Sequence, residues 1–96
     1  MREPAIYMLA TKPYGTLYVG VTSDLVKRIW EHRNNAVDGF TKRYGVHRLV
    51  RFELFRSMVE AIEREKELKQ WRRAWKIALV EKANPDWCDL WPEISQ

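Results

Sequence analysis

The stretch Ala5–Val21, AIYMLATKPYGTLYVGV, decides the fold, because it has the pattern of two strands joined by a short turn. Ala5 to Ala10 and Thr16 to Val21 are rich in apolar, aromatic and β-branched residues, as strands are. Between them, Lys12-Pro13-Tyr14-Gly15 is a turn signal, since proline presets one φ angle and glycine accepts unusual ones. So short a connection predicts an antiparallel hairpin.

The hairpin brings two tyrosines together. If the turn centres on Lys12-Pro13, Tyr7 lies directly across from Tyr18. Residues opposite each other in antiparallel strands share one face of the sheet, so the two hydroxyls would stand side by side. The alternative is that both are packing aromatics whose hydroxyls reach solvent, so the pair alone does not define a site.

A helix is expected directly after the hairpin. Ser23-Asp24 offers an N-cap, and an aspartate suits the positive end of the helix dipole. We expect the helix to run to about Ala36, with Leu25, Ile29 and Ala36 on its buried face.

The second half of the chain predicts one more strand and more helix. Phe40 to His47 is expected to be a basic, aromatic loop, and Arg48 to Phe55 alternates as a third strand. Ser57 to about Ala83 has helical periodicity and predicts two helices or one kinked helix. The apolar stripe of this segment consists of Met58, Ala61, Ile62, Leu68, Trp75 and Leu79. Trp71 is expected beside this stripe, and we expect most of the tryptophans to belong to the core.

The element order ββαβαα predicts an α+β domain in which a small antiparallel sheet is covered by helices. With 96 residues, 46% of them hydrophobic, the chain suits one domain spanning 1–96. The single cysteine, Cys88, cannot form an internal disulfide, and we see neither a signal peptide nor a membrane-spanning apolar run, so we expect a cytoplasmic protein without a membrane partner. The net charge of +4 favours a polyanionic partner.

Arg28 and His32 are four residues apart, so they share one side of the first helix. A guanidinium there could hold a phosphate in bidentate fashion, and an imidazole could pass a proton or bond a phosphate oxygen. A solvated helix flank, with Glu31 and Asp24 as salt partners, is the alternative.

Glu65 falls among the apolar residues of the later helical stripe. A carboxylate there is costly unless it is paired or bound to a metal, so it needs an arginine such as Arg28, a tyrosine hydroxyl or a cation. One carboxylate without a His/Cys cluster suits zinc poorly, but it suits Mg²⁺, which keeps most of its waters.

A third set of candidates lies in the basic loop. Lys42 and Arg43 would meet phosphates, and Phe40 or Tyr44 could stack on a base. Arg33, at the end of the first helix, is a fourth candidate for nucleic-acid binding besides Lys42, Arg43 and Tyr44. A plain surface loop is the alternative.

Together these motifs resemble the GIY-YIG nuclease domain, and most closely its small stand-alone bacterial members, which are similar to the N-terminal domain of the excinuclease C subunit. The resemblance covers nearly the whole chain. It is carried by Ala5-Ile6-Tyr7, Tyr18-Val19-Gly20, Thr22-Ser23-Asp24-Leu25, Arg28, His32 and Glu65, and by the stretches Leu17–Thr22, Phe40–Tyr44 and Arg64–Trp71.

The resemblance implies a three-stranded antiparallel sheet flanked by helices. It also implies a DNA endonuclease that uses one Mg²⁺ or Mn²⁺ ion and has a role in DNA repair or processing. It implies that Glu65 ligates the metal and that Arg28 stabilises the phosphoryl charge. Either Tyr7 or Tyr18 would position or deprotonate the attacking water. His32 fills a position where family members carry histidine or tyrosine.

Three positions depart from the family pattern. Ala5 replaces the first glycine of the name motif, and Val21 stands where some relatives have a lysine that assists the tyrosine. Asn84, the only late asparagine, lies outside the expected spacing and receives no catalytic role.

Two other interpretations remain open at this stage. One is a nucleic-acid-binding module with little or no catalysis. The other makes Glu65 and Arg28 an internal salt bridge. For a nuclease, a homodimer or a partner protein would supply targeting.

Overall fold

A three-stranded antiparallel sheet forms the centre of the computed structural model, which describes residues 3–96. The strands are β1 (Ala5–Ala10), β2 (Leu17–Thr22) and β3 (Arg48–Leu54), in the order β2-β1-β3. Every residue of β1 is buried, as expected of a central strand covered on both faces. The predicted α+β class and three-stranded antiparallel sheet are confirmed.

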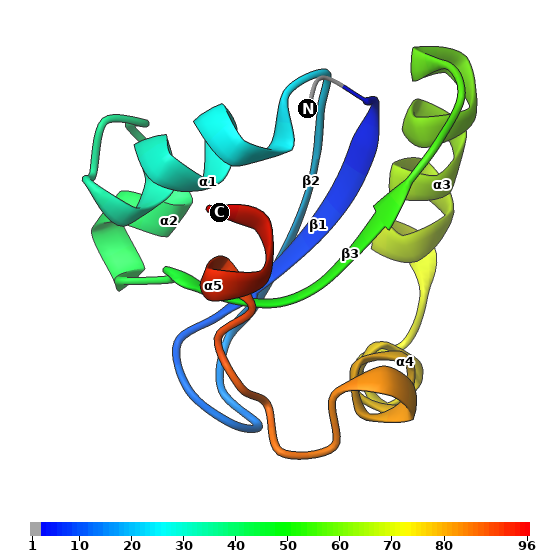
Figure 1. Ribbon diagram of the computed structural model, residues 1–96. Coiled ribbons are helices and arrows are strands. Elements are labelled where there is room, and N and C mark those ends of the chain that lie inside the picture. The colour runs from blue at the N-terminus through cyan, green and yellow to red at the C-terminus, as the bar shows by residue number, and fades with distance from the viewer. Residues whose placement is uncertain (1–2) are drawn as a thin grey trace.

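Five helices flank the sheet (Figure 1): α1 (Leu25–Arg33), α2 (Phe40–Tyr44), α3 (Met58–Gln70), α4 (Arg73–Ala83) and α5 (Trp91–Ile94). Helices α3 and α4 lie on one side of the sheet, and α1, α2 and α5 lie on the other. Side chains of β1 alternate between two cores, with Ile6 and Met8 facing α3 and α4 while Tyr7 and Leu9 face α1 and α5.

Two helical segments differ from the sequence-based expectation, and a third agrees with it. Helix α1 ends at Arg33, and Ala36 is exposed rather than buried. The expected loop contains the short helix α2, which Gly45 ends in the left-handed conformation, with φ 65°. The long helical segment forms two helices, which is one of the two arrangements that the sequence predicted. The break lies at Trp71 and Arg72, whose backbone angles are extended.

The hairpin register also differs. Tyr7 pairs with Gly20, and Tyr18 pairs with Leu9, so the tyrosines are diagonal neighbours rather than direct partners. Ala10 pairs with Leu17, which places the turn centre one residue later than expected. Moving the turn centre by one residue shifts the pairing of the two strands by two residues. Because side chains alternate faces with a period of two, both tyrosines still lie on one face of the sheet.

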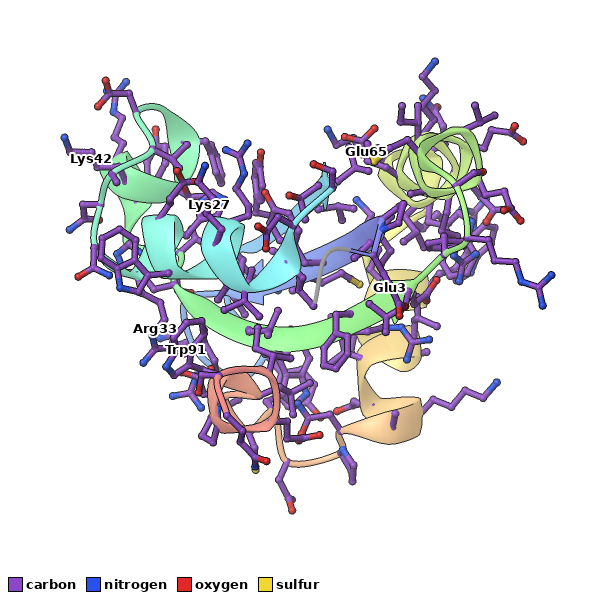
Figure 2. All side chains as sticks on the ribbon, turned by 45° about the horizontal axis from the view of Figure 1, so that its top comes forward. Glu3, Lys27, Arg33, Lys42, Glu65 and Trp91 are labelled. Carbon is purple, nitrogen blue, oxygen red and sulfur yellow. The ribbon has the colours of Figure 1, made fainter. Side chains whose placement is uncertain are left out.

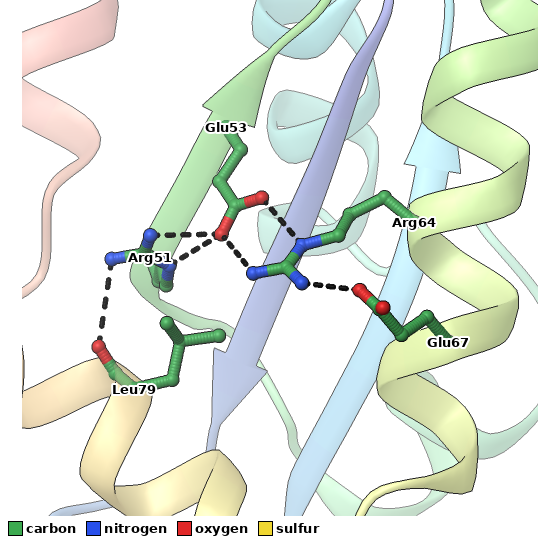
Figure 3. A network of polar contacts seen from close by, with 5 residues as sticks. All are labelled: Arg51, Glu53, Arg64, Glu67 and Leu79. Atoms are coloured by element: carbon green, nitrogen blue, oxygen red, sulfur yellow. Dashed lines mark hydrogen bonds and ion pairs between the residues drawn. The ribbon is translucent and has the colours of Figure 1, made fainter.

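A partly buried charge network fixes α3 and α4 against β3 (Figure 3). Glu53 accepts hydrogen bonds from Arg51 and Arg64, each with a shortest distance of 2.8 Å. Arg64 also pairs with Glu67 on its own helix, and Arg51 donates to the Leu79 carbonyl oxygen of α4 at 3.5 Å. Arg64 immediately precedes Glu65, so the network fixes the helix that carries the candidate metal ligand.

The C-terminal segment packs back on the domain, as expected. Trp87 is almost fully buried, and the backbone N–H of Leu90 donates to the Leu49 carbonyl oxygen at 2.8 Å. Trp75 does not lie in the core: 52% of it is exposed, which corrects its placement on the apolar stripe.

Candidate active site

The rings of Tyr7 and Tyr18 lie with their centroids 6.3 Å apart on one face of the hairpin. Tyr7 is buried, whereas Tyr18 is only partly buried. The two tyrosine rings are therefore neighbours, as the hairpin predicted, but only the Tyr18 ring is accessible to solvent.

Gly20 makes room for the Tyr7 ring. A Cβ atom at position 20 would lie 2.3 Å from Cζ and 2.4 Å from the hydroxyl oxygen of Tyr7, far inside van der Waals contact. The glycine of the second motif is thus required by the tyrosine of the first, because the two are paired across the strands.

His32 holds the Tyr7 hydroxyl. Its Nε2 lies 2.9 Å from the Tyr7 hydroxyl oxygen, and its Nδ1 lies 2.9 Å from Oγ1 of Thr41. Only 2% of His32 is exposed, so it does not belong to a solvated helix flank. Burial, and then the charge of Arg28, lower the pKa of His32 to about 4. The imidazole is therefore neutral at physiological pH, and one of its nitrogens donates while the other accepts.

Thr41 is the site residue that sequence reasoning missed. It is buried on α2, and its hydroxyl is the second partner of His32. A threonine in a basic segment has no distinctive local signal, and its partner lies nine residues away on another helix. Only the spatial position of α2 identifies it.

Arg28, on α1, is near enough to Tyr7 and His32 for its charge to lower the pKa of both. Its side chain is 40% exposed, and its Nε lies 3.7 Å from a Glu31 carboxylate oxygen. It lines a pocket of about 550 Å³ together with Thr22, Ser23, Asp24, Lys27 and Glu31. An exposed guanidinium at the edge of a pocket is available to an anionic ligand.

Glu65 extends from α3 on the side that faces α1 (Figure 2). Only 16% of its side chain is exposed, and its carboxylate accepts a hydrogen bond from Lys69 Nζ at 2.9 Å. The proposed Glu65–Arg28 salt bridge is therefore wrong: the helix supplies a partner four residues away, and Arg28 pairs with Glu31 instead.

The pKa of the Tyr7 hydroxyl links these groups. Burial raises that pKa well above its usual range, and the neighbouring Tyr18 and then Glu65 raise it further, whereas Arg28 lowers it. Side chains from β2, α1 and α3 therefore all act on one hydroxyl of β1. His32 contacts this hydroxyl, the Tyr18 ring lies beside the Tyr7 ring, and the charges of Arg28 and Glu65 affect the pKa of Tyr7.

A divalent cation would find one carboxylate here. Across residues 3–96 no three His, Cys, Asp or Glu side chains gather into a metal-binding group. The donor set is Glu65 with nearby tyrosine hydroxyls, all oxygen atoms. This set does not suit zinc, and it suits Mg²⁺ or Mn²⁺, which retain waters and need few protein ligands.

The predicted nucleic-acid residues of α2 continue outward from the tyrosines. Tyr18 stacks on Phe40 with centroids 6.2 Å apart, and Phe40 contacts Tyr44 at 4.8 Å. Arg43 lies over the Tyr44 ring at 5.6 Å, while Lys42 pairs with Asp38 at 3.3 Å. The exposed fractions of Phe40 and Tyr44 are 46% and 54%, so an aromatic row leads from the buried hydroxyls to the surface.

Arg33 is oriented toward the C-terminal segment instead. It donates to the Asp89 carboxylate at 2.5 Å, and its guanidinium lies 5.2 Å from the Trp91 ring centroid (Figure 2). These contacts connect α1 to the C-terminal segment. Arg33 therefore has a different set of partners from the other three predicted nucleic-acid residues, which lie on α2.

Comparison with protein families supplies the decisive observation: the model of the GIY-YIG catalytic domain matches residues 3–78. The chain belongs to the GIY-YIG nuclease family. The two name motifs of this family are here Ala5-Ile6-Tyr7 and Tyr18-Val19-Gly20, the adjacent strands β1 and β2. The Gly20–Tyr7 contact is therefore a contact between the two motifs.

Small proteins of bacteria and archaea are similar to this GIY-YIG chain. A UPF0213 protein of Staphylococcus saprophyticus is 36% identical over 80 residues, which cover 83% of this chain and 96% of that protein. A UPF0213 protein of Halobacterium salinarum is 43% identical over 67 residues, which cover 68% of this chain and 84% of that protein.

A solution NMR structure of the UPF0213 protein BH0048 from Bacillus halodurans has a similar fold, with a TM-score of 0.53. It is 30% identical in sequence, and the match covers 84% of this chain and 86% of that one. In the described part of the present GIY-YIG chain, no helix has the length and apolar character needed to cross a membrane.

Proposed function

We propose that this protein is a metal-dependent DNA endonuclease that hydrolyses phosphodiester bonds at the site formed by Tyr7, Tyr18, Arg28, His32 and Glu65. The observation that carries the proposal is the packing of Tyr18 and His32 against Tyr7, at 6.3 Å between the tyrosine ring centroids and 2.9 Å from the hydroxyl to Nε2, where the charges of Arg28 and Glu65 also affect the pKa of Tyr7. Perturbed titratable groups from several elements at one pocket are typical of catalytic sites.

The two tyrosines have different tasks in this proposal. Tyr18 is partly exposed and handles the proton of the attacking water. Tyr7 is buried and its raised pKa disfavours the phenolate, so it acts as a neutral hydroxyl that orients the water. His32 positions Tyr7 through the 2.9 Å contact and does not itself reach the phosphate, since Thr41 occupies its other nitrogen.

Charge stabilisation comes from α1 and α3. Arg28, with its exposed guanidinium, binds the phosphoryl oxygens as negative charge develops. Glu65 would hold one Mg²⁺ or Mn²⁺ ion, which supplies charge neutralisation of the scissile phosphate and the leaving oxygen. Lys69 Nζ contacts Oε2 of Glu65, so its charge would compete with that of the ion for the carboxylate.

The substrate strand approaches over α2. Lys42 and Arg43 contact phosphates, and Tyr44 offers a ring to a base, next to Phe40. The resemblance of the sequence motifs to the excinuclease C domain favours a role in DNA repair or processing. We place this activity in the cytoplasm and in a single domain spanning 1–96. Cutting both strands of a duplex with one site would require a homodimer or a partner protein.

Single-turnover cleavage of plasmid, nicked and branched DNA with Mg²⁺ or Mn²⁺ tests the proposal. Glu65→Ala should abolish cleavage, whereas Glu63→Ala, an exposed glutamate on the same helix, should leave the rate unchanged. Equal rates for wild type and Glu65→Ala would reject the site. DNA binding without any metal-dependent cleavage by the wild type would identify a binding module instead.

A further inference from the structure

The junction between α3 and α4 exposes two tryptophans at the surface. Trp71 is partly buried and Trp75 is 52% exposed, with ring centroids 6.2 Å apart in an edge-on arrangement. Trp71 packs against the core between the sheet and these helices, whereas Trp75 lies outside it. Together with Arg72 and Lys76 they form what we call the α3–α4 surface.

This surface is strongly basic. Arg64 to Lys76 contains six lysines and arginines and two glutamates, so this segment has a net charge of +4, equal to that of the whole chain. The positive charge of the protein is therefore concentrated on one short segment instead of spread over its surface.

Only some of these cations are free to meet a ligand. Arg64 is bound in the Glu53 network, and Arg73 donates to the carbonyl oxygens of Tyr14 and Gly15 at 2.6 and 2.7 Å. Within residues 3–96 neither Arg72 nor Lys76 pairs with a carboxylate.

Arg72 is already oriented for an anion. Its guanidinium lies 5.4 Å from the Trp75 ring centroid, and an arginine stacked on an aromatic face keeps the N–H groups in its plane free. Lys76 follows four residues later, on the same side of α4. An exposed indole beside two unpaired cations matches one base and its neighbouring phosphates.

We infer that the α3–α4 surface is a second DNA-binding site, which holds a strand through phosphate contacts of Arg72 and Lys76 and through an unpaired base on Trp75. The candidate active site lies close by on the same helix. Lys69, the partner of Glu65, is two residues before Trp71, and α3 rises roughly 8 Å from Glu65 to Gln70 at 1.5 Å per residue. A strand at Glu65 therefore reaches the α3–α4 surface within a few nucleotides.

Nucleic acid explains this surface better than a second protein. Tryptophan and arginine are common in protein interfaces too, but lysine is depleted there, so Lys76, which pairs with no carboxylate among the described residues, favours the phosphates of a nucleic acid. This inference takes DNA as the partner from the proposed function, but it does not depend on catalysis.

Binding of a fluorescein-labelled 20-nucleotide single strand, measured by fluorescence anisotropy in EDTA, tests the inference. Arg72→Ala and Lys76→Ala should each weaken binding about 3- to 10-fold and reduce the slope of log K against log salt by roughly 0.7. Lys82→Ala removes one exposed cation from the same helix beyond this surface, and should change affinity less than 2-fold.

Trp75 provides the second part of the test. Trp75→Ala should weaken single-strand binding about 5-fold or more, Trp75→Phe should retain most of the affinity, and blunt duplex binding should change little. The inference would be overturned if the Arg72, Lys76 and Trp75 variants bound the single strand as tightly as Lys82→Ala does. It would also be overturned if these variants changed only the oligomeric state. Because no metal is present, this outcome is separate from a failure of Glu65→Ala to abolish cleavage.

Discussion

The Tyr7 hydroxyl and the His32 imidazole form a buried pair, with 2.9 Å between the hydroxyl oxygen and Nε2. The other ring nitrogen of His32 is 2.9 Å from the Thr41 hydroxyl, so a neutral imidazole has partners for its one donor and its one acceptor. A protonated imidazole would have two donors and would sit close to Arg28, whose charge lowers the pKa of His32. The pair is therefore built around a neutral histidine.

Stability should fall as the solution is acidified from pH 6.5 to about 4. Unfolded His32 binds a proton near its ordinary pKa of 6.5, whereas folded His32 binds one only near 4, so protons favour the unfolded state between these values. The contribution of His32 is complete above pH 6.5 and lost below about 4, with a magnitude of about 3 kcal/mol. Urea unfolding across this range measures it. His32→Gln should have a shallower pH dependence, and an identical slope would contradict the assignment.

The two tyrosines should respond unequally to loss of their hydroxyls. Tyr18→Phe should lower the single-turnover cleavage rate by roughly 100-fold or more, because general-base catalysis is lost. Tyr7→Phe should lower it by about 10-fold, because it removes only an orienting hydroxyl. Rates at saturating DNA and metal distinguish them. A larger effect at Tyr7 would reverse the two roles.

Lys69→Gln should tighten Mn²⁺ binding by about 3-fold, since it removes both a cation and the hydrogen-bonded competitor of the metal at Glu65. Isothermal titration calorimetry without DNA measures the change directly. Lys66→Gln is the matched control, an exposed lysine of the same helix without a carboxylate partner among the described residues. If both variants bind Mn²⁺ equally, Lys69 is not a competitor.

Gly20→Ala should destabilise the fold by about 2 kcal/mol or more, because the new methyl group overlaps the Tyr7 ring. In a Tyr7→Ala background the same substitution should cost much less, since the ring is gone. Chemical denaturation of the four proteins of this cycle gives the coupling energy. Additive effects would show that the overlap is relieved elsewhere.

Glu53→Gln should destabilise the protein by about 2 kcal/mol, since it leaves Arg51 and Arg64 without their shared carboxylate. Burial disfavours the charged form of Glu53, yet hydrogen bonds from Arg64 and Arg51 hold the pKa of this carboxyl below its usual range. Glu67→Gln, whose partner is also Arg64 but whose side chain is 54% exposed, should cost no more than about 0.5 kcal/mol. Melting temperatures of the two variants compare a partly buried partner and an exposed partner of one arginine.

The sequence predicted the sheet and the shared face of Tyr7 and Tyr18 because strand periodicity and turn chemistry are local. It failed on their register, since the turn centre is not fixed by Pro13 and Gly15 alone. The sequence also predicted His32 beside the buried stripe of α1, whereas in the structure His32 belongs to that stripe. The i, i+4, i+7 spacing of Leu25, Ile29 and His32 was the signal for this.

Long-range partners were not predictable in the same way. Glu65 required a partner, but the distant Arg28 was named while the helix offered Lys69 at i+4. Thr41 had no signal in the sequence, because its role depends on where α2 packs. Trp75 fitted the apolar periodicity, yet the extended backbone at Trp71 and Arg72 turns α4 away from the direction of α3, so the periodicity does not continue across the break.

The chain of contacts from Thr41 through His32 to Tyr7 has a consequence for the entropy of the reaction. The Tyr7 hydroxyl is oriented when the chain folds, and its rotational freedom is already lost before DNA arrives. The ordering that a substrate would otherwise impose on this group is thus part of the folding free energy of the chain.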